Sequence, residues 1–320
     1  MYVPNCFATR YPGLWFLLPL MSLLASTDPV AVSQKNGFIL DNALIPSDQI
    51  MSGGPGRDGI PSLDNPTFVN ASSATSLSPK DRVLGIEING VARAYPIRIL
   101  NYHEIVNDIV GGEAIVITYC PLCGSGMAFK AEINGKDLEF GVSGLLYNSD
   151  VLLYDRQSGS LWSQILRTAV TGSMKGTRLN AVPLSHTTWR DWQTRHPQTE
   201  VLSTDTGYRR NYRANPYPNY GRSGKLYFPV SEESRLYKRK SMIMGLEVDG
   251  QFKAYPFEEL ENGSTPFTDE FNGERFEVRY DHTNQTAQIF TGGGDEVPTL
   301  IAFWFAWYAF HPEGEVYTAE

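Results

Sequence analysis

Residues 85–96 read GIEINGVARAYP, and residues 245–256 read GLEVDGQFKAYP. In both stretches an Asn-Gly or Asp-Gly pair lies between two alternating runs, which is the strongest short-range signal for a β-hairpin. Each stretch ends in Tyr-Pro, and proline at that point favours the first turn of a helix. The sequence therefore predicts the same hairpin followed by a short helix twice in one chain.

The correspondence continues beyond the two hairpins. Asp108, Gly112, Glu113 and Tyr119 recur as Asp269, Gly273, Glu274 and Tyr280, and Trp189, Trp192, His196 and Pro197 recur as Trp304, Trp307, His311 and Pro312. A repeat this long does not indicate a solenoid. We expect an α+β, β-rich fold of antiparallel hairpins and a few short helices, built from two related halves. The first half covers residues 81–230, and a shorter, degenerate second half covers residues 231–320.

Local signals in the first half predict two of the short helices. Pro96 precedes an expected helix over residues 97–106, and a second helix is expected over residues 187–195, before His196 and Pro197. His103 follows Ile99 and Leu100 at helical spacing, so its side chain is expected to point inward.

Composition limits the classes of function. The chain has 320 residues, of which 42% are hydrophobic and 19% charged, so a large core is expected and disorder is not. The formal net charge is −8 and the pI is about 5.2. Nucleic-acid binding would need clustered Lys and Arg, which the sequence lacks. The expected partners are instead a small ligand, a metal donor or a redox partner.

The N-terminus has the pattern of a signal peptide. Arg10 precedes an apolar run over residues 14–24, and the small residues Ala25, Ser26 and Thr27 follow. Residues 1–27 are therefore predicted to direct export to the periplasm or the extracellular space. A retained N-terminal membrane anchor is the alternative. Residues 28–80 are rich in Gly, Pro, Ser and Asn and are expected to form an extended lead-in.

Residues 118–125 read TYCPLCGS and follow the apolar run 114–117, which is typical of a buried strand. Pro121 and Gly124 end that strand in a loop, which places the thiols of Cys120 and Cys123 at its end. Two thiols at this spacing can chelate a soft metal or exchange with disulfides. A structural disulfide is a weaker explanation, because closing so short a loop removes little chain entropy. Metal binding is the first hypothesis, and a thiol-disulfide oxidoreductase that uses the same cysteines is the second.

His103 is the expected third metal ligand, and Glu104 beside it either orients the imidazole or binds the metal itself. Met127 offers a thioether, and the combination of Cys, His and Met favours copper over zinc. The alternatives are a core histidine bonded to a backbone carbonyl and a methionine that fills space. His186 is the next candidate ligand.

A dense polar group follows the cysteines, and it comprises Asn148, Asp150, Asp155 and Arg156. These residues are candidates for lining a substrate pocket beside the thiols, in a hydrolase or a ligand-binding module. The alternative is an Asx turn with a structural Asp155–Arg156 pair. A tyrosine-rich run over residues 212–220 is expected to form a surface loop that shields the site.

The internal repeat separates the residues expected to maintain the fold from those expected to act. Cys120 aligns with Asp281, Cys123 with Asn284, and His103 with Ser264. The second half therefore lacks the thiol and imidazole set, and the expected site belongs to the first half alone.

The segments TYCPLCG (118–124), FGVSGLLYNSD (140–150), YDRQ (154–157) and LWSQ (161–164) closely resemble a prokaryotic family known as domain of unknown function 3179. Thr187-Thr188-Trp189, His196-Pro197 and Val201-Leu202-Ser203 also fit its pattern. Tyr102 stands where the family commonly has Trp. The resemblance covers roughly residues 81–316 and implies an exported protein with a CxxC motif. It carries no established reaction, so whether the chain is an enzyme stays open.

Overall fold

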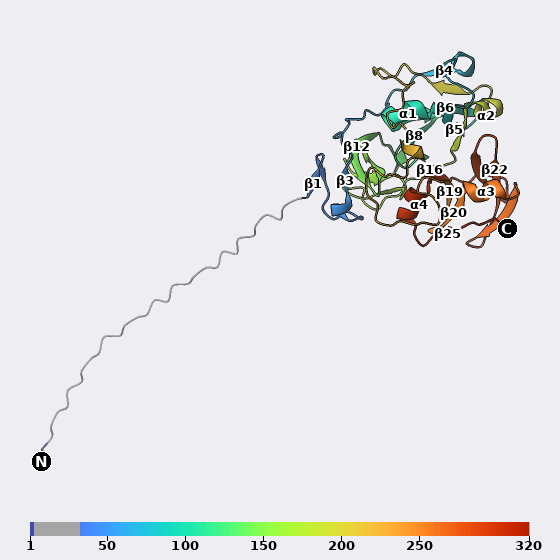
Figure 1. The fold of residues 1–320 in the computed structure, drawn as a ribbon. Helices are drawn as coiled ribbons and strands as arrows, with labels where there is room; N and C mark the ends of the chain where they lie inside the picture. The colour runs from blue at the N-terminus through green and yellow to red at the C-terminus, as the bar shows by residue number, and fades with distance from the viewer. Residues whose placement is uncertain (3–32, 320) are drawn as a thin grey trace. The chain divides into compact units, whose positions relative to one another are not determined.

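The structure is a computed structural model that describes residues 1–2 and 33–319. Nearly all of the predicted signal peptide, including Cys6, lies outside these residues. Val32–Glu320 forms one compact unit, which is described here by itself (Figure 1). In the part of the chain that the structure describes, no helix combines the length and apolar character needed to cross a membrane.

Strands dominate the unit and its helices are short, which confirms the predicted β-rich fold. Nearly all of its strand pairs are antiparallel; the pairs β18–β6 and β20–β25 are parallel. The four α-helices are α1 (Ile97–His103), α2 (Trp189–Arg195), α3 (Phe257–Asn262) and α4 (Trp304–Phe310). Three short 3-10 helices are η1 (Ser47–Gln49), η2 (Ala71–Ser73) and η3 (Tyr220–Arg222).

A five-stranded sheet carries the first of the two predicted hairpins. Its strands, in spatial order, are β17 (Ser185–Thr188), β5 (Arg82–Ile88), β6 (Val91–Pro96), β18 (Glu200–Leu202) and β4 (Phe68–Asn70). Ile88 pairs with Val91 across Asn89 and Gly90, whose φ angles are +51° and +78°. Positive φ at both central residues is what a type I′ hairpin turn requires.

An eight-stranded sheet carries the second predicted hairpin and the strand that ends at Cys120. Its strands, in spatial order, are β25 (Glu315–Val316), β20 (Gln251–Pro256), β19 (Met242–Val248), β24 (Leu300–Phe303), β9 (Ser125–Lys130), β8 (Glu113–Cys120) and β7 (Ile105–Val110), with β16 (Ala181–Val182) also paired to β9. The pairing of β24 with β9 joins elements of the two predicted halves in one sheet.

Two further sheets complete the main architecture. One contains β15 (Thr168–Ala169), β14 (Leu161–Ser163), β13 (Asp150–Asp155), β12 (Phe140–Tyr147) and β3 (Met51–Ser52), and the other contains β21 (Phe267–Phe271), β22 (Glu274–Asp281) and β23 (Thr286–Thr291). Two small ladders pair β1 (Gln34–Lys35) with β2 (Phe38–Ile39) and β10 (Glu132–Ile133) with β11 (Lys136–Asp137). The expected lead-in thus contributes β3 and β4 to the edges of larger sheets.

The two predicted halves share a hairpin, a helix and three strands, followed by a strand, a helix and a strand, but the first half has β10 to β16 inserted before β17. Their hairpins have equivalent registers. Val83 pairs with Pro96 in the first, and Ile243 pairs with Pro256 in the second. A strand-helix unit then packs on each hairpin, as β17–α2 and as β24–α4. In Figure 1, β5, β6, α1 and α2 lie together in one part of the unit, and β19, β20 and α3 in another. Superposition of the halves, which a common origin requires, stays a prediction.

Each hairpin packs a glycine against a tryptophan from its own helix. A Cβ atom on Gly85 would lie 2.3 Å from the Trp192 ring, and one on Gly245 would lie 2.0 Å from the Trp307 ring. Real Cβ atoms do not approach so closely, so only glycine lets the helix rest on the strand at these points. This close contact explains why both glycines belong to the repeated pattern.

Two helix boundaries differ from the prediction. α1 ends at His103, and Glu104 adopts a φ of +59° that turns the chain into β7. The helix prediction over residues 97–106 was wrong there because β7 pairs with β8 along its whole length. α2 begins at Trp189 instead of residue 187, because Thr188 belongs to β17 and its hydroxyl accepts a hydrogen bond from the Asp191 amide.

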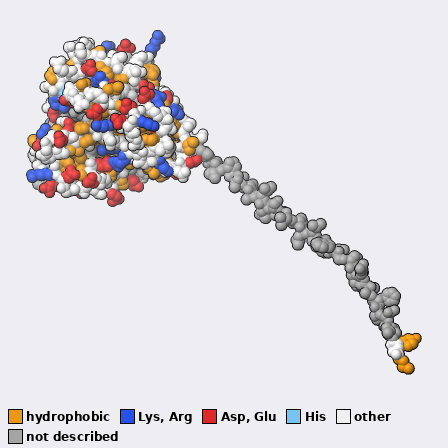
Figure 2. Space-filling model, turned by 180° about the vertical axis from the view of Figure 1, so that it is seen from behind, with side chains coloured by type: hydrophobic (Ala, Val, Ile, Leu, Met, Phe, Trp, Pro, Cys, Tyr) orange, Lys and Arg blue, Asp and Glu red, His pale blue; other side chains and the backbone are white. Residues whose placement is uncertain are grey.

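The largest hydrophobic cluster surrounds the cysteines. It contains both cysteines and fully buried rings from two sheets and one helix, namely Phe129 in β9, Trp162 in β14 and Phe305 in α4. The surface is different in character. On the face shown in Figure 2, acidic and basic side chains are interspersed among neutral ones. The thiols therefore belong to the interior of the unit and not to its charged surface.

Candidate metal centre

The cysteine turn joins two paired strands. Cys120, the last residue of β8, pairs with Ser125, the first residue of β9. Gly124 turns the chain with a φ of +62°, and a Cβ there would lie 3.1 Å from the Phe303 ring. The Phe303 amide donates a 2.8 Å hydrogen bond to the Cys123 carbonyl. A strand from the second predicted half therefore fixes the turn that carries the thiols.

The structure brings a carboxyl group to the two thiols. One ligand atom from each of Cys120, Cys123 and Asp150 lies within 4.8 Å of the others. These residues are 2%, 0% and 0% exposed. Asp150 begins β13, directly after Asn148 and Ser149, whose φ angles are +50° and +68°. The tight turn between β12 and β13 therefore delivers the carboxyl group.

The hydrogen bonds in this group are incomplete. The thiols of Cys120 and Cys123 lie 3.7 and 3.4 Å from the Ser149 carbonyl oxygen, to which both can donate. Oδ2 of Asp150 accepts a 3.2 Å bond from the Ile165 amide. Oδ1 of Asp150 is buried and lacks a hydrogen-bond partner of acceptable geometry among the described residues. A buried polar atom left in this way is uncommon and points to a missing partner.

Burial disfavours charge throughout the group. It raises the pKa of Asp150 to about 7, although amide groups and the neighbouring thiols oppose the shift. Burial, and then the charge of Asp150, raise the pKa of Glu104 to about 8. Burial also raises the pKa of Cys123 well above its usual value, with Cys120 adding to the effect. No ion pair among the described residues includes Glu104 or Asp150. The group therefore collects acids without a balancing cation.

A cavity of about 250 Å³ opens beside the thiols. Glu104, Cys120 and Leu122 form part of its wall, and Tyr217, Tyr227 and Phe228 form another part. The three aromatic residues belong to the long connection between β18 and β19, in which the structure places only η3. The predicted tyrosine-rich loop over residues 212–220 thus contributes Tyr217 to the wall beside the thiols.

His103 is buried, as its spacing predicted, but it does not join the group. Its Nδ1 lies 2.8 Å from the Pro61 carbonyl oxygen, and its Nε2 lies 2.6 Å from the Tyr212 hydroxyl. Both ring nitrogens are therefore engaged. The bond to Pro61 matches the alternative of a core histidine held by a backbone carbonyl. A ligand role for His103 stays a prediction, and it would require these bonds to break.

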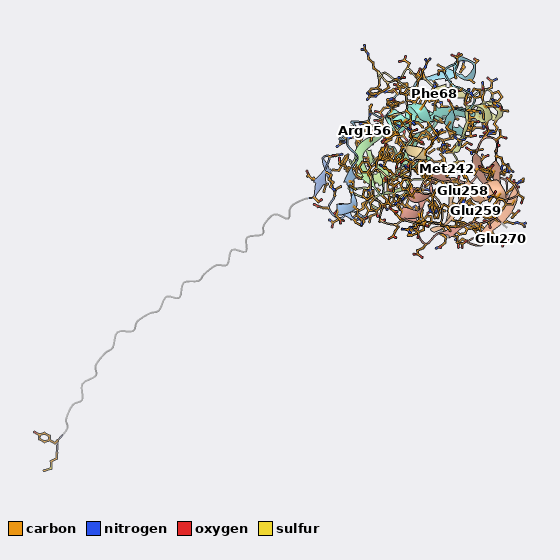
Figure 3. The ribbon with its side chains drawn as sticks, viewed as in Figure 1. Phe68, Arg156, Met242, Glu258, Glu259 and Glu270 are labelled. Carbon is orange, nitrogen blue, oxygen red and sulfur yellow. The ribbon has the colours of Figure 1, made fainter. Side chains whose placement is uncertain are left out.

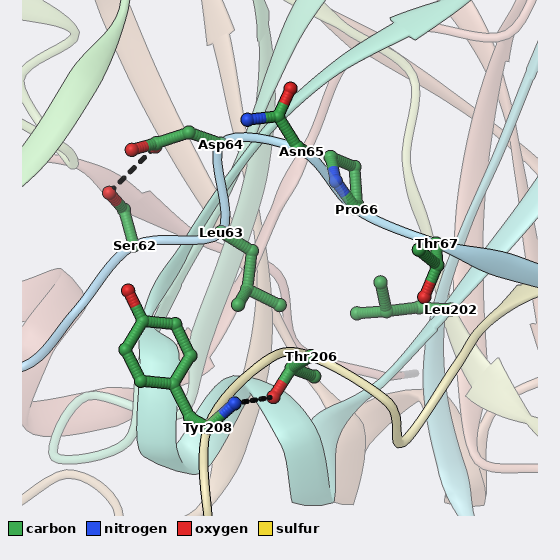
Figure 4. Close-up of a pocket in the computed structure, with 9 residues that line it drawn as sticks. All are labelled: Ser62, Leu63, Asp64, Asn65, Pro66, Thr67, Leu202, Thr206 and Tyr208. Atoms are coloured by element: carbon green, nitrogen blue, oxygen red, sulfur yellow. Dashed lines mark hydrogen bonds between the residues drawn. The ribbon is translucent and has the colours of Figure 1, made fainter.

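A second cavity, of about 210 Å³, lies close to His103 (Figure 4). Tyr208 lines it, and its ring centroid is 5.3 Å from that of His103. Ser62 donates a 2.8 Å hydrogen bond to Asp64 on the opposite wall. No residue lines both this cavity and the cavity beside Cys120.

Met127 and His186, the other candidate ligands, lie in different surroundings. Met127 is buried in β9 and belongs to the hydrophobic cluster that includes both cysteines. His186 lies in β17, and its buried Nδ1 has no partner among the described residues. His186 does not join the group formed by Cys120, Cys123 and Asp150, and a ligand role for Met127 stays a prediction.

The remaining residues predicted to line a pocket have structural partners. Asn148 donates to the Ala309 carbonyl at 3.0 Å and accepts from the Ser231 amide at 2.8 Å. Asp155 accepts hydrogen bonds from the Ser158 amide and the Trp162 indole, which gives the expected Asx turn. These contacts tie the β12–β13 region to α4 and to the connection before β19.

Arg156 does not pair with Asp155, so the expected ion pair between them was wrong. Its guanidinium lies 3.1 Å from Asp64 and 3.5 Å from Asp58, both in the lead-in, and Figure 3 shows its position near β12. Asp155 is the last residue of β13 and Arg156 begins the turn that follows it, and the two side chains meet different partners.

Sequence reasoning missed a buried polar network that supports the turn. Ser125 donates a 2.6 Å hydrogen bond to Gln164, and Gln164 donates a 2.8 Å bond to the Thr118 hydroxyl. These residues flank the cysteines on β8 and β9 and reach across to β14. The polar residues at the ends of the TYCPLCGS and LWSQ stretches were the available signal.

Comparison with known proteins identifies a family, but the description of that family assigns no activity. A family model described as "Protein of unknown function (DUF3179)" matches residues 57–295. Neither a curated protein nor a solved structure matches the chain. The functional argument therefore depends on the geometry of the site.

Proposed function

The chain belongs to the DUF3179 family, and we propose that it is an exported protein that binds a thiophilic metal ion through Cys120, Cys123 and Asp150. The observation that carries this proposal is the buried group of Cys120, Cys123 and Asp150, whose ligand atoms lie within 4.8 Å of one another and in which Oδ1 of Asp150 has no hydrogen-bond partner of acceptable geometry among the described residues. A divalent cation would supply that partner. It would also displace the protons that burial favours on these ligands and balance the charge of the resulting anions.

The spacing of the three residues suits a single ion. Zinc binds thiolate sulfur at about 2.3 Å and carboxylate oxygen at about 2.0–2.2 Å in a tetrahedral arrangement. Ligand atoms within 4.8 Å of one another need only small side-chain movements to reach that arrangement. Cys120 and Asp150 lie on strand ends, and Cys123 lies in the short turn between β8 and β9 that the Phe303 amide holds. Sites on strands are more precise than sites on free loops.

The donor set favours zinc over copper. The sequence favoured copper because it placed His103 and Met127 beside the thiols. The structure instead places the carboxyl group of Asp150 there. Carboxylate oxygen is a common zinc ligand, whereas copper(I) prefers soft sulfur donors. Zinc is therefore the first choice for this site, and copper is the second.

Thiol-disulfide exchange is the alternative function, and the closeness of the two sulfurs and the Asp150 carboxyl supports it. The burial of both thiols argues against exchange with protein disulfides, because a reactive cysteine must be accessible and partly ionised. The raised pKa of Cys123 disfavours its thiolate further. Bound metal would also protect the pair in an oxidising compartment, where unprotected thiols do not persist.

The test is to purify the full chain anaerobically from the export compartment, count metal by mass spectrometry and titrate thiols before and after chelation. We expect about one zinc per chain, with thiols masked until a chelator is added. Cys120→Ser, Cys123→Ser and Asp150→Asn should each lower metal affinity at least tenfold.

Met127→Leu is the matched control, because it keeps the volume of a buried neighbour and should retain the metal. His103→Asn tests the expected histidine ligand in the same assay. Metal-free protein with a Cys120–Cys123 disulfide that dithiols readily reduce would overturn the metal proposal in favour of redox chemistry.

A further inference from the structure

The cavity beside Cys120 is built from five separate parts of the chain, one of which is Glu104 at the end of α1. The turn after β8 contributes Cys120 and Leu122, the β12–β13 sheet contributes Val142, the lead-in contributes Ile60, and the connection before β19 contributes Tyr227. Its volume of about 250 Å³ equals that of about eight water molecules, at roughly 30 Å³ each in the liquid. The space therefore suits a small molecule and not a peptide.

The chemistry of the walls selects against charge. Most lining side chains are aliphatic or aromatic, and none is Lys, Arg or His. An anion would lose its hydration without gaining a cationic partner, which is costly in an apolar site. The polar side-chain groups in the wall are the carboxyl of Glu104, the thiol of Cys120 and the tyrosine hydroxyls. Specific polar contacts are therefore few and lie mainly at the thiol end.

An exposed ring belongs to the same wall. Tyr227 is 55% exposed, which is unusual for a large aromatic residue, and its ring centroid lies 4.5 Å from that of Tyr220. The backbone nearby is fixed, since the Ser149 hydroxyl donates to the Phe228 carbonyl at 3.3 Å. A ring held in place on a cavity wall offers a flat apolar surface on which another ring can pack.

We infer that this cavity binds a small uncharged molecule with an aromatic or alkyl body and a single hydroxyl or thiol group directed at Cys120 and Glu104. The inference deepens the proposed function, because that polar group would lie next to the metal held by Cys120, Cys123 and Asp150. Neither Cys123 nor Asp150 lines the cavity, so the two ideas can be tested separately.

The experiment uses the full chain, both metal-loaded and chelated, and measures binding by ligand-observed NMR. The probes are benzyl alcohol and benzyl mercaptan, with benzoate as a charged analogue of similar size. We expect the neutral probes to bind at least tenfold more tightly than benzoate, because the walls hold no cationic partner for a carboxylate. Tyr227→Ala should weaken their binding at least fivefold.

Tyr208→Ala is the matched control, because Tyr208 is 46% exposed, lies in the same connection and lines the other cavity. It should leave binding unchanged. Equal binding of neutral and charged probes, unchanged affinity in Tyr227→Ala, or no binding to either form of the protein would overturn the inference. Neutral binding to protein that takes up no metal would support the cavity site and refute the metal proposal instead.

Discussion

The turn after β8 and the turn after β22 occupy equivalent positions in the two predicted halves, yet their interactions are opposite in kind. Cys120 pairs with Ser125 in one, and Asp281 pairs with Thr286 in the other. In the second turn, the Asp281 carboxylate accepts from the Thr283 amide at 2.8 Å and from the Asn284 side chain at 2.7 Å. The Asp281 carboxylate therefore finds its partners within its own turn, although the buried Oγ1 of Thr286 has none among the described residues.

The pKa values of the two aspartates show the same contrast. Burial alone would raise the pKa of Asp281, but hydrogen bonds from Asn284 and Thr283 hold it below its usual value. The pKa of Asp150 is raised to about 7, and its Oδ1 lacks a partner. A carboxylate that has its hydrogen bonds within its own turn needs no ligand, and Asp281 is in that position. Buried acids left incomplete identify the site where a ligand is expected.

The predicted equivalence of the halves is tested most strongly at the two packed glycines. Gly85→Ala and Gly245→Ala should each lower the free energy of unfolding by roughly 3 kcal/mol, because the added methyl group overlaps a tryptophan ring. Denaturant unfolding measures both effects. Gly292→Ala is the control, since a Cβ there meets nothing within 4 Å and the change should stay within about 0.5 kcal/mol. A mild effect at only one of the two glycines would break the comparison.

The aspartates should give opposite pH dependences of stability in chelated protein. Asp150 has a folded pKa of about 7 against 3.8 as the ordinary value, so the folded state binds the extra proton between these values. Its contribution is present at low pH and is lost as pH rises towards 7, by about 2–3 kcal/mol between pH 5 and pH 7. Asp281 has a lowered pKa, so its contribution is present at neutral pH and is lost as pH falls.

Unfolding curves of Asp150→Asn and Asp281→Asn between pH 3 and pH 7 measure these contributions. Asp150→Asn should remove part of the loss of stability on raising the pH, with Glu104 contributing the rest, and Asp281→Asn should remove part of the loss on lowering it. Zinc should reverse the trend in the unmodified chain, because metal binding requires the deprotonated ligands. Parallel pH profiles for the two variants would contradict the contrast between the turns.

The smallest effect, measured as metal content, is expected when two cysteines are placed in the second turn. The double variant Asp281→Cys with Asn284→Cys places two thiols in the second turn, but no carboxyl group there corresponds to Asp150 in the group of three. Metal counted per chain should therefore stay at one. A second tightly bound ion in this variant would show that two cysteines suffice and that Asp150 is not needed.

The sequence predicted features that depend on short stretches. Asn89-Gly90 and Asp249-Gly250 form the expected hairpin turns, because positive φ is a local preference of these residues. The inward position of His103 followed from helical spacing. Its partners did not, because Pro61 and Tyr212 lie in irregular segments without periodicity.

The approach of Asp150 to the thiols was also beyond local reasoning. It depends on a register shift between Val142 and Leu145 and on the positive φ of Asn148 and Ser149. Asp150 was among the predicted pocket residues, but nothing in its own stretch distinguished it from Asp155. Only the packing of two sheets separates the aspartate that meets the sulfurs from the one that closes a turn.

The hydrogen bond from the Phe303 amide to the Cys123 carbonyl also sets an order of events during synthesis. Both cysteines are synthesised long before β24 and α4. The hydrogen bond from the Asn148 side chain to the Ala309 carbonyl also cannot form until α4 has been synthesised. Contacts between such distant residues form late, because chain closure must precede them. The thiols are therefore unsupported in the nascent chain, and a chain released without its last strands and helix would carry the motif without the geometry that makes it a site.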